Sequence, residues 1–169
     1  MEFRFSIAYH TGAEKSPELR KLWIFRAGSR ARPCHVLANK MREMNDRRTR
    51  TPLALVDTFG CQQNVADGEV LMGMLREMGY ELTRDENQAD VILLNTCAIR
   101  EHAEKRVYGH LGRLSHTKAA KPDQIICLCG CMAQQKVVAD KVKNSYHHVD
   151  LVLGPQAEWR LPELLHEVY

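Results

Sequence analysis

Three apolar runs of this chain each end in a cysteine, and the three cysteines are almost evenly spaced. Cys61, Cys97 and Cys131 lie 36 and 34 residues apart. A repeat of this length accommodates one strand and one helix, so each cysteine would end one of three successive strands. Because the carboxyl ends of parallel strands meet at one edge of a sheet, this spacing predicts that three thiols come together there.

The segments around these cysteines alternate between strand and helix patterns. Residues 53–56 and 91–94 are continuous apolar runs, which are typical of parallel strands covered on both faces. Residues 64–79 carry apolar side chains at helical spacing, which predicts a helix that Asn64 caps and Gly79 ends. The other predicted strands are 80–83, 124–128 and 150–154, and the other predicted helices are about 100–116, 133–144 and 161–168. This alternation predicts an α/β fold with a doubly wound, mostly parallel, flavodoxin-like sheet.

The first 50 residues differ in charge from the rest of the chain. They carry 12 Lys and Arg against 5 Asp and Glu, whereas residues 51–169 carry 12 against 16. We expect residues 1–50 to be a basic, partly disordered extension with a short amphipathic helix around Leu37, Met41 and Met44. Arginines of this segment holding a nucleic-acid backbone are the alternative interpretation. Residues 51–169 are expected to form the domain itself.

The chain contains six cysteines, no apolar run long enough to cross a membrane and no apolar signal segment at its start. These features predict a cytoplasmic protein that does not associate with a membrane. In that compartment cysteines are reduced thiols or metal ligands rather than disulfides.

Three thiolates at one sheet edge suit an iron–sulfur cluster with one iron left open to another ligand. Gly60 and Gly130 each precede one of these cysteines and allow the backbone to turn sharply beside a bulky group. Zinc, with His102 or His110 as a fourth ligand, is the alternative, although the chain has no Cys-x2-Cys pair.

Two further cysteines lie in the strand predicted before Cys131. Cys127 is interpreted as a core residue, because a free cysteine usually packs as a small apolar side chain. Cys129 alternates in phase with Cys131 and is interpreted as structural or as a neighbour of the ligands.

Each cysteine of the evenly spaced set lies in a longer motif. Residues 58–64 read Thr-Phe-Gly-Cys-Gln-Gln-Asn, residues 95–104 read Asn-Thr-Cys-Ala-Ile-Arg-Glu-His-Ala-Glu, and residues 129–134 read Cys-Gly-Cys-Met-Ala-Gln. In this order and at this spacing, the motifs closely resemble the N-terminal domain of the radical-SAM methylthiotransferases. The resemblance covers about residues 53–169 and is strongest to the branch that modifies N6-isopentenyladenosine-37 in tRNA.

This resemblance implies that Cys61, Cys97 and Cys131 bind an auxiliary [4Fe-4S] cluster. The open iron of that cluster would supply the sulfur of the 2-methylthio group. The residues that the resemblance places beside these ligands, where they would orient the thiolates, are Asn64, Asn95, Gly60 and Gly130.

The family also uses S-adenosylmethionine and a second [4Fe-4S] cluster, which a Cys-x3-Cys-x2-Cys motif holds in a following barrel domain. This chain contains no such motif. We therefore expect an N-terminal part that lacks the radical-SAM barrel and the C-terminal RNA-binding domain. Its expected partners are that barrel and tRNA, and it is expected to be inactive in isolation. The alternatives are a cluster-free flavodoxin-like binding module and a non-functional gene fragment.

Overall fold

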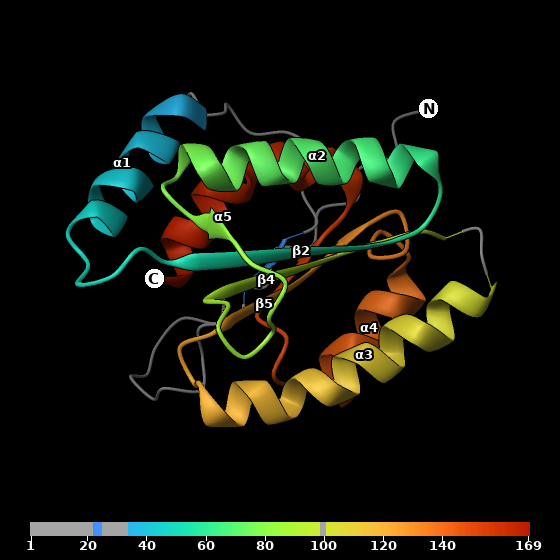
Figure 1. Cartoon of the computed structure of the whole chain (residues 1–169). Helices are drawn as coiled ribbons and strands as arrows, with labels where there is room; N and C mark the ends of the chain where they lie inside the picture. The colour runs from blue at the N-terminus through green and yellow to red at the C-terminus, as the bar shows by residue number, and fades with distance from the viewer. Residues whose placement is uncertain (1–21, 25–33, 99–100) are drawn as a thin grey trace, which may run out of the picture.

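The computed structural model describes residues 22–24, 34–98 and 101–169, and within them six strands form one sheet (Figure 1). The strands are β1 (Leu22–Ile24), β2 (Leu53–Phe59), β3 (Glu81–Leu82), β4 (Val91–Thr96), β5 (Ile125–Gly130) and β6 (Leu151–Leu153). The helices are α1 (Cys34–Asp46), α2 (Gln62–Glu77), α3 (Glu101–Ala120), α4 (Lys136–Ser145), the 3-10 helix η1 (Pro155–Arg160) and α5 (Leu161–Val168).

The strand order across the sheet is β1-β6-β5-β4-β2-β3, and each neighbouring pair is parallel. From β2 the chain first moves outward to β3 and then returns across β2 to β4, β5 and β6. This is the order of flavodoxin-like folds, in which the winding reverses between the first and third strands. The predicted α/β, doubly wound, parallel architecture is confirmed, and the reversal lies between β2 and β4.

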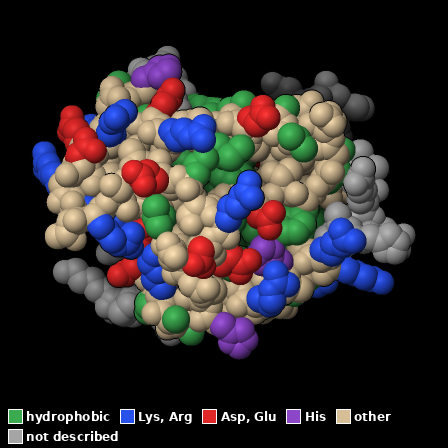
Figure 2. Space-filling model, viewed as in Figure 1, with side chains coloured by type: hydrophobic (Ala, Val, Ile, Leu, Met, Phe, Trp, Pro, Cys, Tyr) green, Lys and Arg blue, Asp and Glu red, His purple; other side chains and the backbone are tan. Residues whose placement is uncertain are grey.

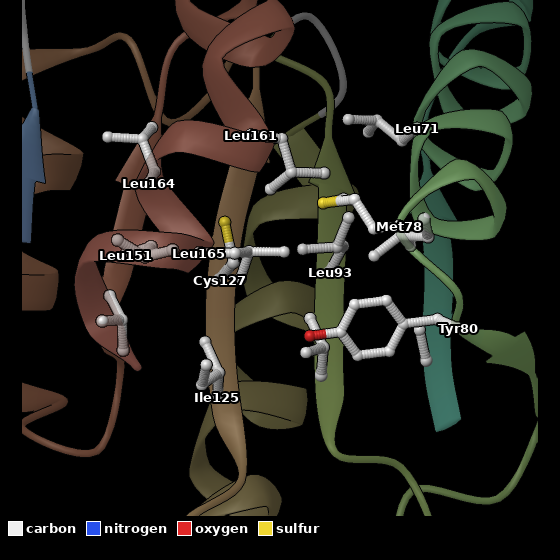
Figure 3. Packing of buried hydrophobic residues seen from close by; sticks show 14 of the residues in the cluster. Leu71, Met78, Tyr80, Leu93, Ile125, Cys127, Leu151, Leu161, Leu164 and Leu165 are labelled. Carbon is white, nitrogen blue, oxygen red and sulfur yellow. The ribbon is translucent and has the colours of Figure 1, made fainter. Parts of the chain in front are cut away.

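Helices cover both faces of the sheet: α1, α2 and α5 lie on one face, and α3 and α4 lie on the other (Figure 1). The strand side chains alternate between these two layers, as the period of a strand requires. In β4, Leu93 packs toward the first layer, whereas Ile92 and Leu94 pack toward the second. Figure 3 shows Leu93 and its neighbours between α2 and α5. Both faces are apolar, which explains why the strands read as continuous apolar runs.

The predicted elements are present, with differences at their ends. The last helix begins and ends where the sequence predicts, and the positive φ of 85° at Gly79 ends α2 as expected. The strands β4 and β5 extend to Thr96 and Gly130 and therefore reach the cysteines directly. In contrast, α4 begins at Lys136 rather than near 133, because turns occupy residues 131–135.

The short helix predicted in the basic segment is present as α1, and it packs against α5 and α2. Leu37 and Met41 are buried as predicted, but Met44 is 37% exposed and the buried residue next to it is Asn45. The Asn45 side chain donates a hydrogen bond to the carbonyl of Met78 at 2.8 Å. Residues 1–21 and 25–33 lie outside the described residues, and the division of the chain at residue 50 stays a prediction.

On the face seen in Figure 2, Lys and Arg side chains are interspersed with Asp and Glu, and hydrophobic side chains reach the surface between them. Mixed charges of this kind are typical of a solvated surface. None of the helices in the described part of the chain is long and apolar enough to cross a membrane.

Asp90 connects the segment before β2 to the start of β4, at the sheet edge opposite the cysteines. Its carboxylate accepts two hydrogen bonds from Arg50, at 2.6 and 2.9 Å, and one from the backbone N–H of Leu53 at 2.8 Å. Lys121 lies 2.7 Å away as a second cation. Burial opposes ionisation of Asp90, but the hydrogen bonds from Arg50 and Lys121 outweigh it and lower the pKa of this carboxyl group.

Replacing Asp90 with Asn should therefore destabilise the fold. We expect the free energy of unfolding at pH 7 to fall by about 2–3 kcal/mol, since several charge-assisted hydrogen bonds are lost. Because the folded-state pKa is lowered, this contribution exists above the pKa of the unfolded chain and disappears as the pH falls through the folded-state value. Urea unfolding at pH 7 and near pH 3 measures the difference. The exposed Glu77→Gln change on α2 is the control, and a difference between wild type and Asp90→Asn that persists unchanged at low pH would contradict this account.

Candidate metal centre

The register of the sheet brings the three evenly spaced cysteines to one edge. Phe59 is paired with Thr96, and Thr96 is paired with Gly130, at the last positions of β2, β4 and β5. Cys97 and Cys131 are each the next residue after these paired ends, and Cys61 is the second. Since neighbouring strands are about 5 Å apart, the three residues emerge side by side at the reversal of the strand order. In Figure 1 this edge is where α2 and α3 begin.

Cys61 begins the helix α2, which corrects the expected role of Asn64. The helix starts two residues earlier than predicted, with Cys61 at the N-cap position and Asn64 in the first turn. The backbone N–H of Asn64 donates to the Cys61 sulfur, and the Asn64 side-chain oxygen accepts from the Cys61 N–H at 3.4 Å. Asn64 is therefore the second partner of a capping box rather than the cap itself.

These contacts favour the thiolate form of Cys61. Hydrogen bonds from the backbone N–H groups of Asn64 and Gln63 lower the pKa of the Cys61 thiol, and a hydrogen bond from Cys97 acts in the same direction. The groups that lower it belong to the free amides of a helix N-terminus, where negative charge is stabilised. Cys61 is thus a half-buried thiol prepared to act as a ligand or a nucleophile.

A buried pair of side-chain amides connects the first two cysteines. Asn64 donates from Nδ2 to Oδ1 of Asn95 at 3.0 Å and to the carbonyl of Thr96 at 3.2 Å. Asn95 donates from its own Nδ2 to the backbone carbonyl of Asn64 at 2.8 Å. Both residues are almost completely buried. This reciprocal pairing fixes the start of α2 against the end of β4, and therefore fixes Cys61 relative to Cys97.

The two glycines of the site occupy positions where a side chain does not fit. A Cβ atom on Gly60 would lie 2.8 Å from the Cβ of Cys97 and would also clash with the Asn64 side chain. Gly130 has φ of 92°, and a Cβ there would lie 2.6 Å from Oδ1 of Asn95 and even closer to the Thr96 carbonyl. Glycine is therefore required at both positions for the backbone to approach closely.

The surroundings of Cys131 are acidic. Its pKa is raised by partial burial and by the negative charges of four neighbours, which are Cys97, Cys61, Asp67 and Glu158. The strand register places Cys131 beside the other two cysteines, so their charges act on it. Cys131 should therefore remain protonated at a pH where Cys61 is already ionised.

Two of these neighbours, Asp67 on α2 and Glu158 on η1, are not predicted from the sequence. Glu158 is 9% exposed, and its Oε1 atom has no hydrogen-bond partner. Burial and the charge of Asp67 raise the pKa of Glu158 to about 7. Neither residue lies in a ligand-like motif, and Glu158 is 27 residues beyond Cys131. The sequence signal for such residues is an Asp or Glu at a helix position where an apolar side chain would be expected to pack against the strand ends.

Cys127 and Cys129 belong to the core, as predicted for Cys127. Both are completely buried on the face of β5 that packs against α5, and Figure 3 shows Cys127 beside Leu165. A hydrogen bond with Cys127 and burial raise the pKa of the Cys129 thiol well above its ordinary value. In addition, Cys129 donates a weak hydrogen bond to the carbonyl of Leu94 at 3.6 Å. Completely buried thiols of this kind are structural.

The zinc alternative needs three or more ligands around one ion. Among the described residues, no group of three His, Cys, Asp or Glu side chains has that arrangement. His110 lies instead between Glu86, 2.7 Å from its Nε2, and Asp57, 3.4 Å from its Nδ1. It also contacts the edge of Phe59. The side chain of His102 lies outside the described residues.

The fold and this edge define a flavodoxin-like α/β domain with three cysteines at the reversal of its strand order. The family model described as "Uncharacterized protein family UPF0004" matches residues 54–154. This match covers more than half of the chain and includes all three cysteines. The chain belongs to this family, which is the N-terminal domain of the methylthiotransferases.

Curated relatives agree with this assignment. Proteins named tRNA-2-methylthio-N(6)-dimethylallyladenosine synthase from Staphylococcus aureus strains JH9, Newman and COL are each 47% identical to the chain over 130 residues. The matched region is 77% of this chain and 24% of each relative. The chain thus spans about a quarter of the length of the curated relatives that it matches.

The opposite pKa shifts of Cys61 and Cys131 predict an order of reactivity. In the reduced, chelator-treated chain, iodoacetamide should modify Cys61 several-fold faster than Cys131 near pH 8, because only the thiolate reacts. The pH at which the rate reaches half its maximum should be lower for Cys61. Peptide mass spectrometry after timed quenching measures both rates, with the buried Cys127 as the internal unreactive control. Faster modification of Cys131 at every pH would contradict the geometry described for α2.

Proposed function

We propose that Cys61, Cys97 and Cys131 hold an auxiliary [4Fe-4S] cluster that serves methylthiolation of tRNA. The observation that carries this proposal is the convergence of three thiols at the reversal of a parallel sheet, with glycine required beside two of them. Cysteine thiolates are the usual ligands of such clusters. In a cluster each cysteine binds a different iron, so three sulfurs around a single ion are not needed.

The charges of the site support a cationic occupant. Cys61, Cys97, Asp67 and Glu158 all act on Cys131 as negative charges. Three thiolates and two carboxylates in one place repel each other, and this repulsion is relieved when positive charge lies between them. The core of iron and sulfide ions in a [4Fe-4S] cluster carries positive charge and accepts thiolates directly.

The chain's own residues would keep the three thiolates in place. The Asn64–Asn95 pair holds Cys61 against Cys97, and the free amides at the start of α2 stabilise the Cys61 thiolate. Gly60 and Gly130 allow the backbone to pass close to the bound group. Contacts of this kind orient ligands and fix their charge.

When bound, a cluster with three protein ligands supplies an open iron at which sulfur can be held for transfer. By analogy with the relatives, we propose that the acceptor is N6-dimethylallyladenosine in tRNA, with S-adenosylmethionine as cosubstrate. The 169-residue segment contains no Cys-x3-Cys-x2-Cys motif for a radical-generating cluster. We propose that it contributes the sulfur-holding step and does not turn over alone. A cytoplasmic location fits this role.

Anaerobic reconstitution with iron and sulfide tests the proposal. The wild-type chain should take up about four irons and show the broad visible absorption of a cluster. Cys61→Ala, Cys97→Ala and Cys131→Ala should each lose most of the bound iron, because each removes one of only three protein ligands. Iron analysis and visible spectra, normalised to folded protein, measure the effect.

The matched control for these variants is Cys127→Ala, which removes a thiol from the core and none from the site. It should lower stability but bind as much iron per folded chain as wild type. Loss of iron in Cys127→Ala equal to that in the three ligand variants would contradict the assignment. If the wild-type chain binds no iron, the cluster-free binding module becomes the better account.

A further inference from the structure

A polar cavity lies at the opposite end of β2 from the cysteines. It has a volume of about 280 Å³ and is lined by residues 48–52 together with Asn45, Asp46 and Gly79. In Figure 1 the connection from α1 to β2, which provides most of these residues, lies at the left beside the end marked C. β2 has seven residues, and a strand rises about 3.3 Å per residue, so about 20 Å of sheet separates the cavity from Cys61. The cavity is therefore separate from the candidate metal centre.

Arg48 lines this cavity with its guanidinium group held against an aromatic ring. Its Cζ atom lies 4.7 Å from the centroid of the Tyr169 ring, and the Tyr80 hydroxyl donates a hydrogen bond to the Tyr169 hydroxyl at 3.0 Å. Stacking uses the flat face of a guanidinium group and leaves the N–H donors at its edge available to an anion. Arg48 forms no ion pair with a carboxylate among the described residues. Its positive charge is therefore oriented but not neutralised.

Arg50 adds a second guanidinium group to the cavity, and its side chain is 56% exposed. Asp90 pairs with Arg50 at 2.6 Å and with Lys121 at 2.7 Å, so a single carboxylate faces two cations. Asp46 is the only acid among the described residues that line the cavity. Arg47, which is exposed, adds a further positive charge beside it. This end of the sheet therefore has an excess of positive charge.

The other groups that line the cavity suit a phosphate and a sugar better than a base. Thr49 and Thr51 supply exposed hydroxyl groups. Pro52 and Gly79 are the apolar lining residues, and neither offers an aromatic face on which a base could stack. Arginine and hydroxyl donors without such a face are typical of contacts to the backbone of a nucleic acid. A site for a free nucleotide would need an apolar wall for the base.

We propose that Arg48 and Arg50, with the hydroxyl groups of Thr49 and Thr51, bind a phosphate group of an RNA backbone. The choice of RNA as the source of this phosphate rests on the proposed function, in which the acceptor is a base of tRNA. The phosphate and the acceptor base are held at opposite ends of β2, so they belong to different parts of one RNA molecule. Phosphate contacts fix the position of a nucleic acid without reading its sequence. The cavity thus orients the RNA relative to the sulfur-holding edge.

The test measures binding of a fluorescein-labelled RNA hairpin to the whole 169-residue chain without iron. Fluorescence anisotropy gives the affinity over a range of KCl concentrations for wild type, Arg48→Gln and Thr49→Val. Arg113→Gln is the matched control, because Arg113 is 67% exposed on α3 in the opposite helix layer. Arg50 is left unchanged, since its hydrogen bonds to Asp90 stabilise the fold. Urea midpoints establish that each variant is folded, and a second titration measures binding of inorganic phosphate alone.

We expect Arg48→Gln to bind the hairpin several-fold more weakly than wild type. The slope of the logarithm of affinity against the logarithm of salt concentration should become shallower by about 1, because one phosphate contact is lost. Thr49→Val should weaken binding with the slope unchanged, since it removes a hydroxyl group and no charge. Arg113→Gln should retain the affinity and slope of wild type. A general effect of net charge predicts instead that Arg48→Gln and Arg113→Gln lose the same affinity.

The proposal is overturned if Arg48→Gln and Arg113→Gln weaken binding equally, or if Arg48→Gln keeps the salt slope of wild type. Binding of inorganic phosphate without binding of the hairpin assigns the cavity to a free phosphate and overturns it too. If Arg48→Gln does not fold, Thr49→Val decides, and an unchanged affinity in that variant rejects the site. A wild-type chain that binds no iron rejects the proposed function instead, while the hairpin affinities still decide whether the cavity binds RNA.

Discussion

The site depends on the buried pairing of Asn64 with Asn95. These two amides exchange hydrogen bonds across the gap between α2 and β4, and one of them also holds the carbonyl of Thr96. Buried amides that satisfy each other in this way specify one arrangement, because any shift leaves donors and acceptors unpaired. The relative positions of Cys61 and Cys97 follow from this pairing. The small residues Gly60 and Gly130 are needed because the paired amides fill the space beside them.

The two ends of the sheet edge that carries the cysteines have opposite electrostatic environments. At Cys61, the amides of a helix N-terminus favour negative charge, whereas at Cys131 burial and neighbouring acids oppose it. A site with only the acidic, buried environment would keep its thiols protonated. A site with only the helix N-terminus would hold thiolates even without a bound group. The combination gives a Cys61 thiolate that can begin binding and a Cys131 thiol that ionises when positive charge arrives.

Much of this arrangement could be predicted from the sequence. Continuous apolar runs and helical spacing identify the strands and helices, and the position of Cys61, Cys97 and Cys131 after these runs brings them together in any parallel sheet. The sequence predicts a helix start at Asn64 because Asn is a common cap and Cys is not. Only the structure shows that the Cys61 sulfur accepts the capping hydrogen bond.

Other parts of the site could not be predicted in this way. Glu158 is buried because η1 packs against β5, and local sequence patterns carry no information about such a tertiary contact. The basic composition of residues 1–50 likewise concealed that α1 packs against α5, since the buried face of α1 is short. Charge and periodicity predict only the average exposure of a helix. Individual buried side chains such as Met41 decide which other element it packs against.

The proposed function requires that three particular sulfurs surround one cluster at the carboxyl edge of the sheet. The most direct measurement is a crystal structure of the anaerobically reconstituted chain, with iron located by its anomalous scattering. We predict one compact iron peak between the Sγ atoms of Cys61, Cys97 and Cys131, with one iron that has no cysteine ligand. Iron bound elsewhere, or a cluster that takes Cys129 in place of one of the three, would contradict the account.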